Sequence, residues 1–104
     1  RRFIDVTVRY DDLTILAQWG AMNLNPNKHL KRVADGIIPI SFLVATSSVN
    51  YSVMLSMNLD GKDPKAGIIQ YGSQTKSSVN VLTFDLTGKL TAFSGNFTMV
   101  ITTS

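Results

Sequence analysis

The sequence predicts an all-β fold, an immunoglobulin-like sandwich of about seven strands, and three observations lead to this prediction. Hydrophobic residues make up 44% and charged residues 16% of the 104 positions, a balance that argues against disorder. All 7 acidic residues are Asp, while Ser, Thr, Val and Asn are abundant, as in β-sheet proteins. Short alternating segments recur between turn signals roughly every 8–15 residues, the spacing of a β-sandwich. We therefore expect one domain of two packed sheets.

The first predicted strand alternates without interruption from Ile4 to Tyr10. Four apolar side chains alternate with polar ones and share one face: Ile4, Val6, Val8 and Tyr10. Two interpretations are open for this strand: it completes the sheet of its own chain, or it inserts into a neighbouring molecule. Residues 1–12 are interpreted as an extension and candidate donor strand, and residues 13–104 as the body of the sandwich.

The segments that follow are less regular. Residues 13–19 form a predicted short strand with Ile15, Ala17 and Trp19 on one face, although a helical turn fits nearly as well. The single tryptophan, Trp19, is expected in the core, where the large ring of a small sandwich is usually buried. Residues 28–34 are expected to form one or two turns of helix that a glycine ends.

Five further predicted strands complete the pattern. They cover residues 36–47, 51–59, 67–71, 79–86 and 97–102. Pro39 lacks an amide hydrogen, so it marks an edge, a strand start or a bulge in the first of these segments. In the last segment Phe97, Met99 and Ile101 share one face, which gives the chain a second regular strand near its C-terminus.

The residue types give little support for catalysis or for a bound cofactor. The only histidine, His29, lies among basic residues without a nearby carboxylate, and we expect it to be exposed in a loop. The absence of cysteine excludes disulfides and thiolate zinc sites. Asp60 and Asp63 carry oxygens that suit calcium, but their loop lacks the other ligands and is interpreted as a turn. We therefore expect no enzyme, metal or cofactor.

A mild basic imbalance leaves one alternative function open. The net charge is +3, and three basic residues near the middle of the chain form a candidate basic surface: Lys28, Lys31 and Arg32. Nucleic-acid domains usually concentrate more charge with interleaved aromatic residues, so we expect no nucleic-acid partner. No apolar run approaches the ~20 residues of a membrane span. The alternative is a module that binds a glycan or an acidic partner through residues 23–32, with Trp19 and Tyr71 as possible stacking groups.

The C-terminal stretch SGNFTMVITTS carries a family resemblance. It resembles the closing strand of bacterial chaperone–usher pilins, in which a Gly-Asn-Tyr/Phe step leads into an alternating strand; here the step is Gly95, Asn96 and Phe97. The N-terminal FIDVTVRYDDLTIL is similar in layout to the start of the same family. The lack of cysteine matches the branch of colonisation-factor pilins.

The resemblance implies a structural subunit of a surface fimbria, a class of subunit that can also be adhesive. In such pilins the sandwich lacks a strand, and the extension of a neighbour fills the groove by strand addition. Ile4, Val6, Val8 and Tyr10 would then be donor side chains, and Phe97, Met99 and Ile101 would belong to the acceptor strand. The implied partners are copies of this chain or related pilins, a periplasmic chaperone and usher, and a host receptor; the implied location is the cell surface, reached through the periplasm.

Overall fold

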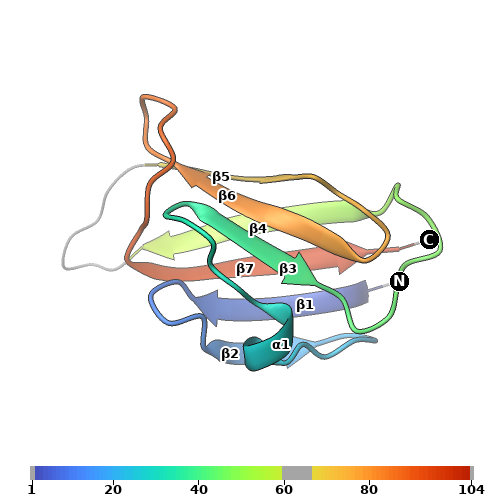
Figure 1. Ribbon diagram of the computed structural model, residues 1–104. Coiled ribbons are helices and arrows are strands. Elements are labelled where there is room, and N and C mark those ends of the chain that lie inside the picture. The colour runs from blue at the N-terminus through green and yellow to red at the C-terminus, as the bar shows by residue number, and fades with distance from the viewer. Residues whose placement is uncertain (1, 60–66, 104) are drawn as a thin grey trace.

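The computed structural model describes residues 2–59 and 67–103, and it is a sandwich of two antiparallel sheets (Figure 1). The strands are β1 (Arg2–Arg9), β2 (Ile15–Trp19), β3 (Ile37–Ser41), β4 (Ser52–Leu59), β5 (Ile68–Gly72), β6 (Ser78–Phe84) and β7 (Gly95–Thr102). One sheet has the order β2-β1-β7-β4 and the other the order β3-β6-β5. The predicted all-β sandwich of seven strands is confirmed for the described residues.

The core lies between the two sheets and takes alternate side chains from most of the strands. The interior positions that are 0–1% exposed are Ile4, Val6, Val8, Tyr10, Ile38, Ile40, Val79, Val81, Thr83, Phe97, Met99 and Ile101. In β1, β6 and β7 every second residue is buried, because successive side chains of a strand point to opposite faces. The strict alternation in the sequence therefore predicted the inward faces of β1 and β7 correctly. In β6 the sequence favoured a face made of Leu82, Phe84 and Leu86, and this prediction is wrong: the buried face is Val79, Val81 and Thr83, and Leu86 is exposed.

The predicted helix is shorter than expected and begins earlier. It is the single turn α1 (Pro26–His29), in which the Asn25 side chain accepts a hydrogen bond from the Asn27 amide at 2.9 Å. Pro26 occupies the first helical position, where a missing amide hydrogen costs nothing. His29 is buried, not exposed as expected, because its Nδ1 accepts a 2.8 Å hydrogen bond from the Asn25 amide and fixes the turn.

The expectation that Trp19 lies in the core is wrong, and a β-bulge explains the error. Between β1 and β2 the register runs from Thr7 opposite Ala17 to Val8 opposite Ile15, so one residue of β2 is left unpaired. The bulge moves Ile15 to the inward face, while Trp19 lies opposite the outward Asp5. The Trp19 side chain is consequently 58% exposed.

The predicted strand over residues 36–47 is also shorter than expected, since β3 ends at Ser41. Phe42 still packs inward, and its ring makes edge contacts with Phe3 and Tyr51 at centroid distances of 5.6 and 5.7 Å. Beyond it the chain leaves the sheet, and Leu43 and Val44 are exposed.

Two glycines with the same backbone conformation allow a matched test of close packing at the start of β3. Gly36 and Gly88 have φ values of +84° and +86°, so an alanine would cost each about 1 kcal/mol of conformational energy. A Cβ at Gly36 would lie 2.7 Å from the Thr83 carbonyl oxygen and 2.9 Å from the Thr91 nitrogen, whereas a Cβ at Gly88 would meet no described atom within 4 Å. In urea unfolding we expect Gly36→Ala to cost about 1–3 kcal/mol more than Gly88→Ala. Equal losses would show that the close approach at Gly36 is not a constraint.

Candidate strand-exchange site

The first strand occupies an interior position of the four-stranded sheet. β1 lies between β2 and β7 and is antiparallel to both (Figure 1). Its pairing with β7 runs from Arg2 opposite Thr102 to Arg9 opposite Asn96, and the Tyr10 amide adds a further hydrogen bond to the Gly95 carbonyl at 2.9 Å. In this structure β1 therefore fills a gap in the sheet of its own chain.

The side chains predicted as donor and acceptor are direct cross-strand neighbours. Ile4 lies opposite Ile101, Val6 opposite Met99 and Val8 opposite Phe97. All six are at most 1% exposed, as is Tyr10 at the end of the same face. Cross-strand pairs at this spacing are the unit that stabilises a sheet, so this row of side chains holds β1 in place.

The outer side of the same pairing has one polar contact. Thr7 lies opposite Thr98, and their Oγ1 atoms form a 3.0 Å hydrogen bond. Thr98 also lies opposite Ser56 of β4 on its other side. The row Thr7, Thr98 and Ser56 therefore crosses three adjacent strands on the outward face of the sheet.

Tyr10 ends the inward row in a polar pocket that sequence reasoning did not find. Its hydroxyl lies 2.9 Å from the Gly36 amide nitrogen and 3.2 Å from Thr83 Oγ1. The Arg32 guanidinium lies over its ring, 4.6 Å from the centroid. The one signal in the sequence was that a residue with a hydroxyl follows three aliphatic residues on an otherwise apolar face.

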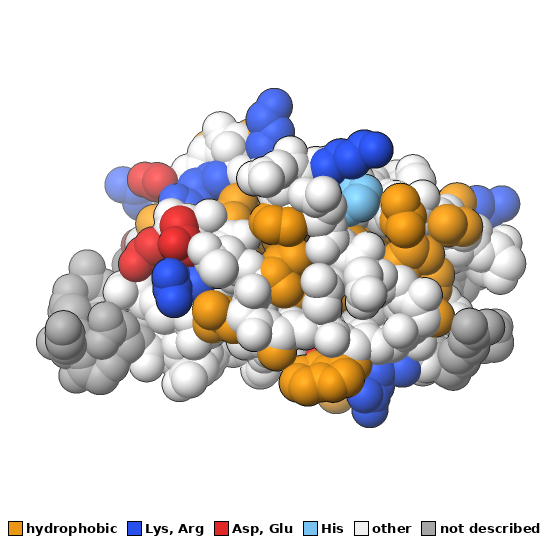
Figure 2. All heavy atoms as spheres, turned by 90° about the horizontal axis from the view of Figure 1, so that it is seen from below, with side chains coloured by type: hydrophobic (Ala, Val, Ile, Leu, Met, Phe, Trp, Pro, Cys, Tyr) orange, Lys and Arg blue, Asp and Glu red, His pale blue; other side chains and the backbone are white. Residues whose placement is uncertain are grey.

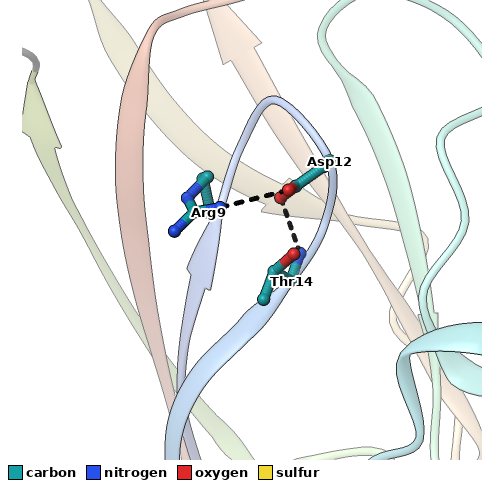
Figure 3. Close-up of polar contacts among 3 residues, drawn as sticks. All are labelled: Arg9, Asp12 and Thr14. Carbon is teal, nitrogen blue, oxygen red and sulfur yellow. Dashed lines mark hydrogen bonds and ion pairs between the residues drawn. The ribbon is translucent and has the colours of Figure 1, made fainter.

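A short turn joins β1 to β2 and is the hinge at which strand exchange would open the molecule. The Arg9 amide donates to the Thr14 carbonyl and the Leu13 amide to the Arg9 carbonyl, both at 2.9 Å. Inside the turn the Asp12 carboxylate forms an ion pair with Arg9 at 3.2 Å and accepts a 3.0 Å hydrogen bond from the Thr14 amide (Figure 3). These contacts hold the turn closed at the protein surface.

Leu13 is the strained point of this hinge. Its φ is +58°, in the left-handed region that costs an L-residue roughly 1–2 kcal/mol and favours glycine. The Leu13 side chain is half-buried and packs against the core. The closed turn therefore combines favourable polar contacts with an unfavourable backbone, and opening the hinge would release that backbone cost.

The candidate basic surface and the candidate stacking groups do not form a single site. Lys28 and Lys31 are exposed, whereas Nε and Nη2 of Arg32 are buried against Tyr10. Figure 2 shows basic side chains distributed around the face that contains β2 and α1, with no single basic patch. Trp19 belongs to β2 and Tyr71 to β5, which are edge strands of different sheets.

The remaining candidates add no further site. Asp60 and Asp63 lie outside the described residues. Among the described residues, no helix has the length and apolar character needed to cross a membrane. Comparisons of the chain with known protein families, with curated proteins and with solved structures found no match.

The hinge predicts a measurable acid sensitivity. Hydrogen bonds from the Thr14 side chain and amide, together with the nearby Arg9 charge, hold the pKa of the Asp12 carboxyl below its usual value. Because the pKa is lower in the folded state, this contribution is fully present above the ordinary Asp pKa of ~3.9 and is lost as the pH falls through the lowered pKa. We expect an NMR titration of the Asp12 carboxyl carbon to show that lowered midpoint, with the Thr14 amide following it.

Thr14→Val is the matched control for this titration, since it removes the hydroxyl and keeps the shape of the side chain. In this variant the midpoint of Asp12 should move back toward the ordinary value. A midpoint that is the same in both chains would contradict the assignment of the hydrogen bond.

Proposed function

We propose that this chain is a structural subunit of a bacterial surface fibre and that it assembles by donation of β1 to the sheet of a neighbouring copy. The observation that carries the proposal is the position of β1. It supplies an interior strand of the sheet, and a short turn over residues 10–14 joins it to β2. A strand with these two properties can be supplied by another copy, whose β1 would make the same contacts with β2 and β7.

The energetics of exchange favour neither arrangement strongly. Burial of Ile4, Val6, Val8 and Tyr10 contributes on the order of 6–10 kcal/mol before ordering costs. The same contacts form whether β1 comes from its own chain or from a neighbour, so they cancel between the two states. Two contributions to the free-energy difference between the states remain. The effective concentration of the attached strand, in the mM range for a short connection, favours the self-filled state. The backbone cost at Leu13, which an opened hinge would release, favours exchange.

Donation of β1 makes a head-to-tail contact that does not close on itself, and such contacts generate fibres. A copy whose groove is empty would present the edge of β7 with Phe97, Met99 and Ile101 uncovered. An uncovered apolar edge is prone to aggregation, which is the physical reason for a periplasmic chaperone and an usher as partners. The cell surface is the corresponding location, and a host receptor is a possible further partner of the fibre.

Disulfide trapping across the Thr7–Thr98 pair tests the proposal directly. The natural chain has no cysteine, so Thr7→Cys in one chain and Thr98→Cys in another introduce a single thiol each. The two positions are opposite each other in β1 and β7, and a disulfide between the two chains requires β1 of one chain to lie beside β7 of the other. After unfolding and refolding the mixture, we expect a disulfide-linked heterodimer whose yield rises with protein concentration.

Thr7→Cys mixed with Ser56→Cys is the matched control. Ser56 also lies opposite Thr98, but on the far side of β7, so exchange does not bring it to position 7. This mixture should give only background crosslinking. The proposal is wrong if the Thr7/Thr98 mixture stays at that background while a single chain with both substitutions forms its internal disulfide.

A further inference from the structure

We infer that Arg32, Gly36 and Thr83 form a tyrosine-recognition pocket, which selects the strand that enters the groove and fixes its register. The strand it fits is an extended segment with three alternating inward aliphatic residues followed by a tyrosine, supplied by a second copy of this chain. This inference rests on the proposed function and adds to it the chemistry by which the partner strand is recognised. All three pocket residues belong to the body, and Tyr10 belongs to the inserted strand.

The hydrogen bonds of the pocket have a defined direction. Thr83 Oγ1 lies 2.6 Å from the Thr91 carbonyl oxygen, and that bond uses the single hydroxyl hydrogen of Thr83. The Tyr10 hydroxyl must then donate to Thr83 Oγ1 and accept from the Gly36 amide. Its donor and one of its acceptor positions are both used in a buried site, as expected of a group that is recognised specifically.

Phenylalanine at position 10 would fill the same space but would leave this pocket unsatisfied. The buried Gly36 amide would lose its acceptor, and Thr83 Oγ1 would lose its donor. A buried donor without a partner has a large desolvation cost, so sites built around a hydroxyl reject the analogue that lacks it. The pocket therefore distinguishes tyrosine from all purely apolar residues.

Arg32 adds a second element that requires an aromatic ring. Its Nε and Nη2 are buried and have no hydrogen-bond partner among the described residues, while its guanidinium lies 4.6 Å from the centroid of the Tyr10 ring. The face of the Tyr10 ring is therefore the favourable contact that the structure shows for the buried nitrogens of this guanidinium. An aliphatic residue at position 10 would remove it and leave a partly buried cation without compensation.

The pocket also explains how one register is chosen among several. A slip of one residue would turn the apolar face of β1 outward, which the core forbids. A slip of two residues keeps the alternation, but brings Val8 to the pocket of Tyr10. Three aliphatic residues on one face discriminate weakly against such a slip, whereas the Gly36 amide and Arg32 would both be left unpaired by a valine.

A competition between two donor strands tests this inference on the full chain. The acceptor carries Thr98→Cys, and equal amounts of two donors both carry Thr7→Cys and Thr83→Val, one with Tyr10 and one with Tyr10→Phe, distinguished by mass. Because Thr83→Val weakens the pocket of the donors themselves, the donor strand gains the full contacts of the Tyr10 hydroxyl only in the groove of the acceptor. The three chains are refolded together in a glutathione buffer that keeps disulfides exchanging, and the heterodimers are counted by mass spectrometry. We expect the Tyr10 donor to exceed the Tyr10→Phe donor by about threefold or more, the effect of about one hydrogen bond.

Two controls separate strand recognition from general loss of stability. A donor with Tyr51→Phe loses another buried hydroxyl, which donates to the Thr75 and Ser78 carbonyls within the body, yet its β1 is unchanged and it should compete equally. An acceptor with Thr83→Val should abolish the preference for Tyr10 over Tyr10→Phe, because the pockets of donor and acceptor are then the same.

The outcomes distinguish this inference from the proposal on which it rests. Equal yields from the Tyr10 and Tyr10→Phe donors would overturn tyrosine recognition and leave strand exchange standing. Absence of heterodimer with either donor would overturn both strand exchange and the recognition of the exchanged strand. A Tyr51→Phe donor that competes as poorly as Tyr10→Phe would also overturn the inference, since any weakened fold would then have the same effect.

Discussion

The pairing of β1 with β7 is the interaction on which the rest of the sandwich depends. Among the described strands, β2 is hydrogen-bonded to the sheet through β1 alone, so loss of this pairing would separate β2 from the sheet and expose the edge of β7. The row from Ile4 opposite Ile101 to Val8 opposite Phe97 is fully buried. Side-chain burial and backbone pairing therefore act in the same strand, and removal of that strand would take Ile4, Val6 and Val8 out of the core.

Strands with strict alternation could be predicted from the sequence, because a period of two reports directly which face is buried. This holds for β1 and β7, and it also placed the candidate donor and acceptor side chains on facing positions. It does not hold for β6, where both faces carry apolar residues and the face with Val79 and Val81 is the buried one. The prediction failed where pairing between strands overrides the pattern. The bulge in β2 exposes Trp19, and the contact between His29 and Asn25 replaces the predicted longer helix with one turn.

The tyrosine pocket could not be predicted from the sequence, for a different reason. The partners of the Tyr10 hydroxyl lie 26 and 73 residues away along the chain. One of them is a backbone amide, which almost every residue carries, so the residue type does not reveal it. The apparent basic cluster was misleading in the same way. Arg32 follows Lys31 in the sequence, but its guanidinium packs on Tyr10, so its role is set by a contact that charge patterning does not encode.

The groove specifies the strand that it accepts and does not specify the chain that supplies it. Every contact of Tyr10 in its pocket is made to the body, and the same is true of Val6 opposite Met99. The balance between a self-filled and a neighbour-filled groove must therefore be set at the hinge, where the contacts of Asp12 hold the turn closed and the backbone of Leu13 opposes it. Because the polar contacts of Asp12 lie at the surface, substitutions of this residue can shift the balance without altering the core.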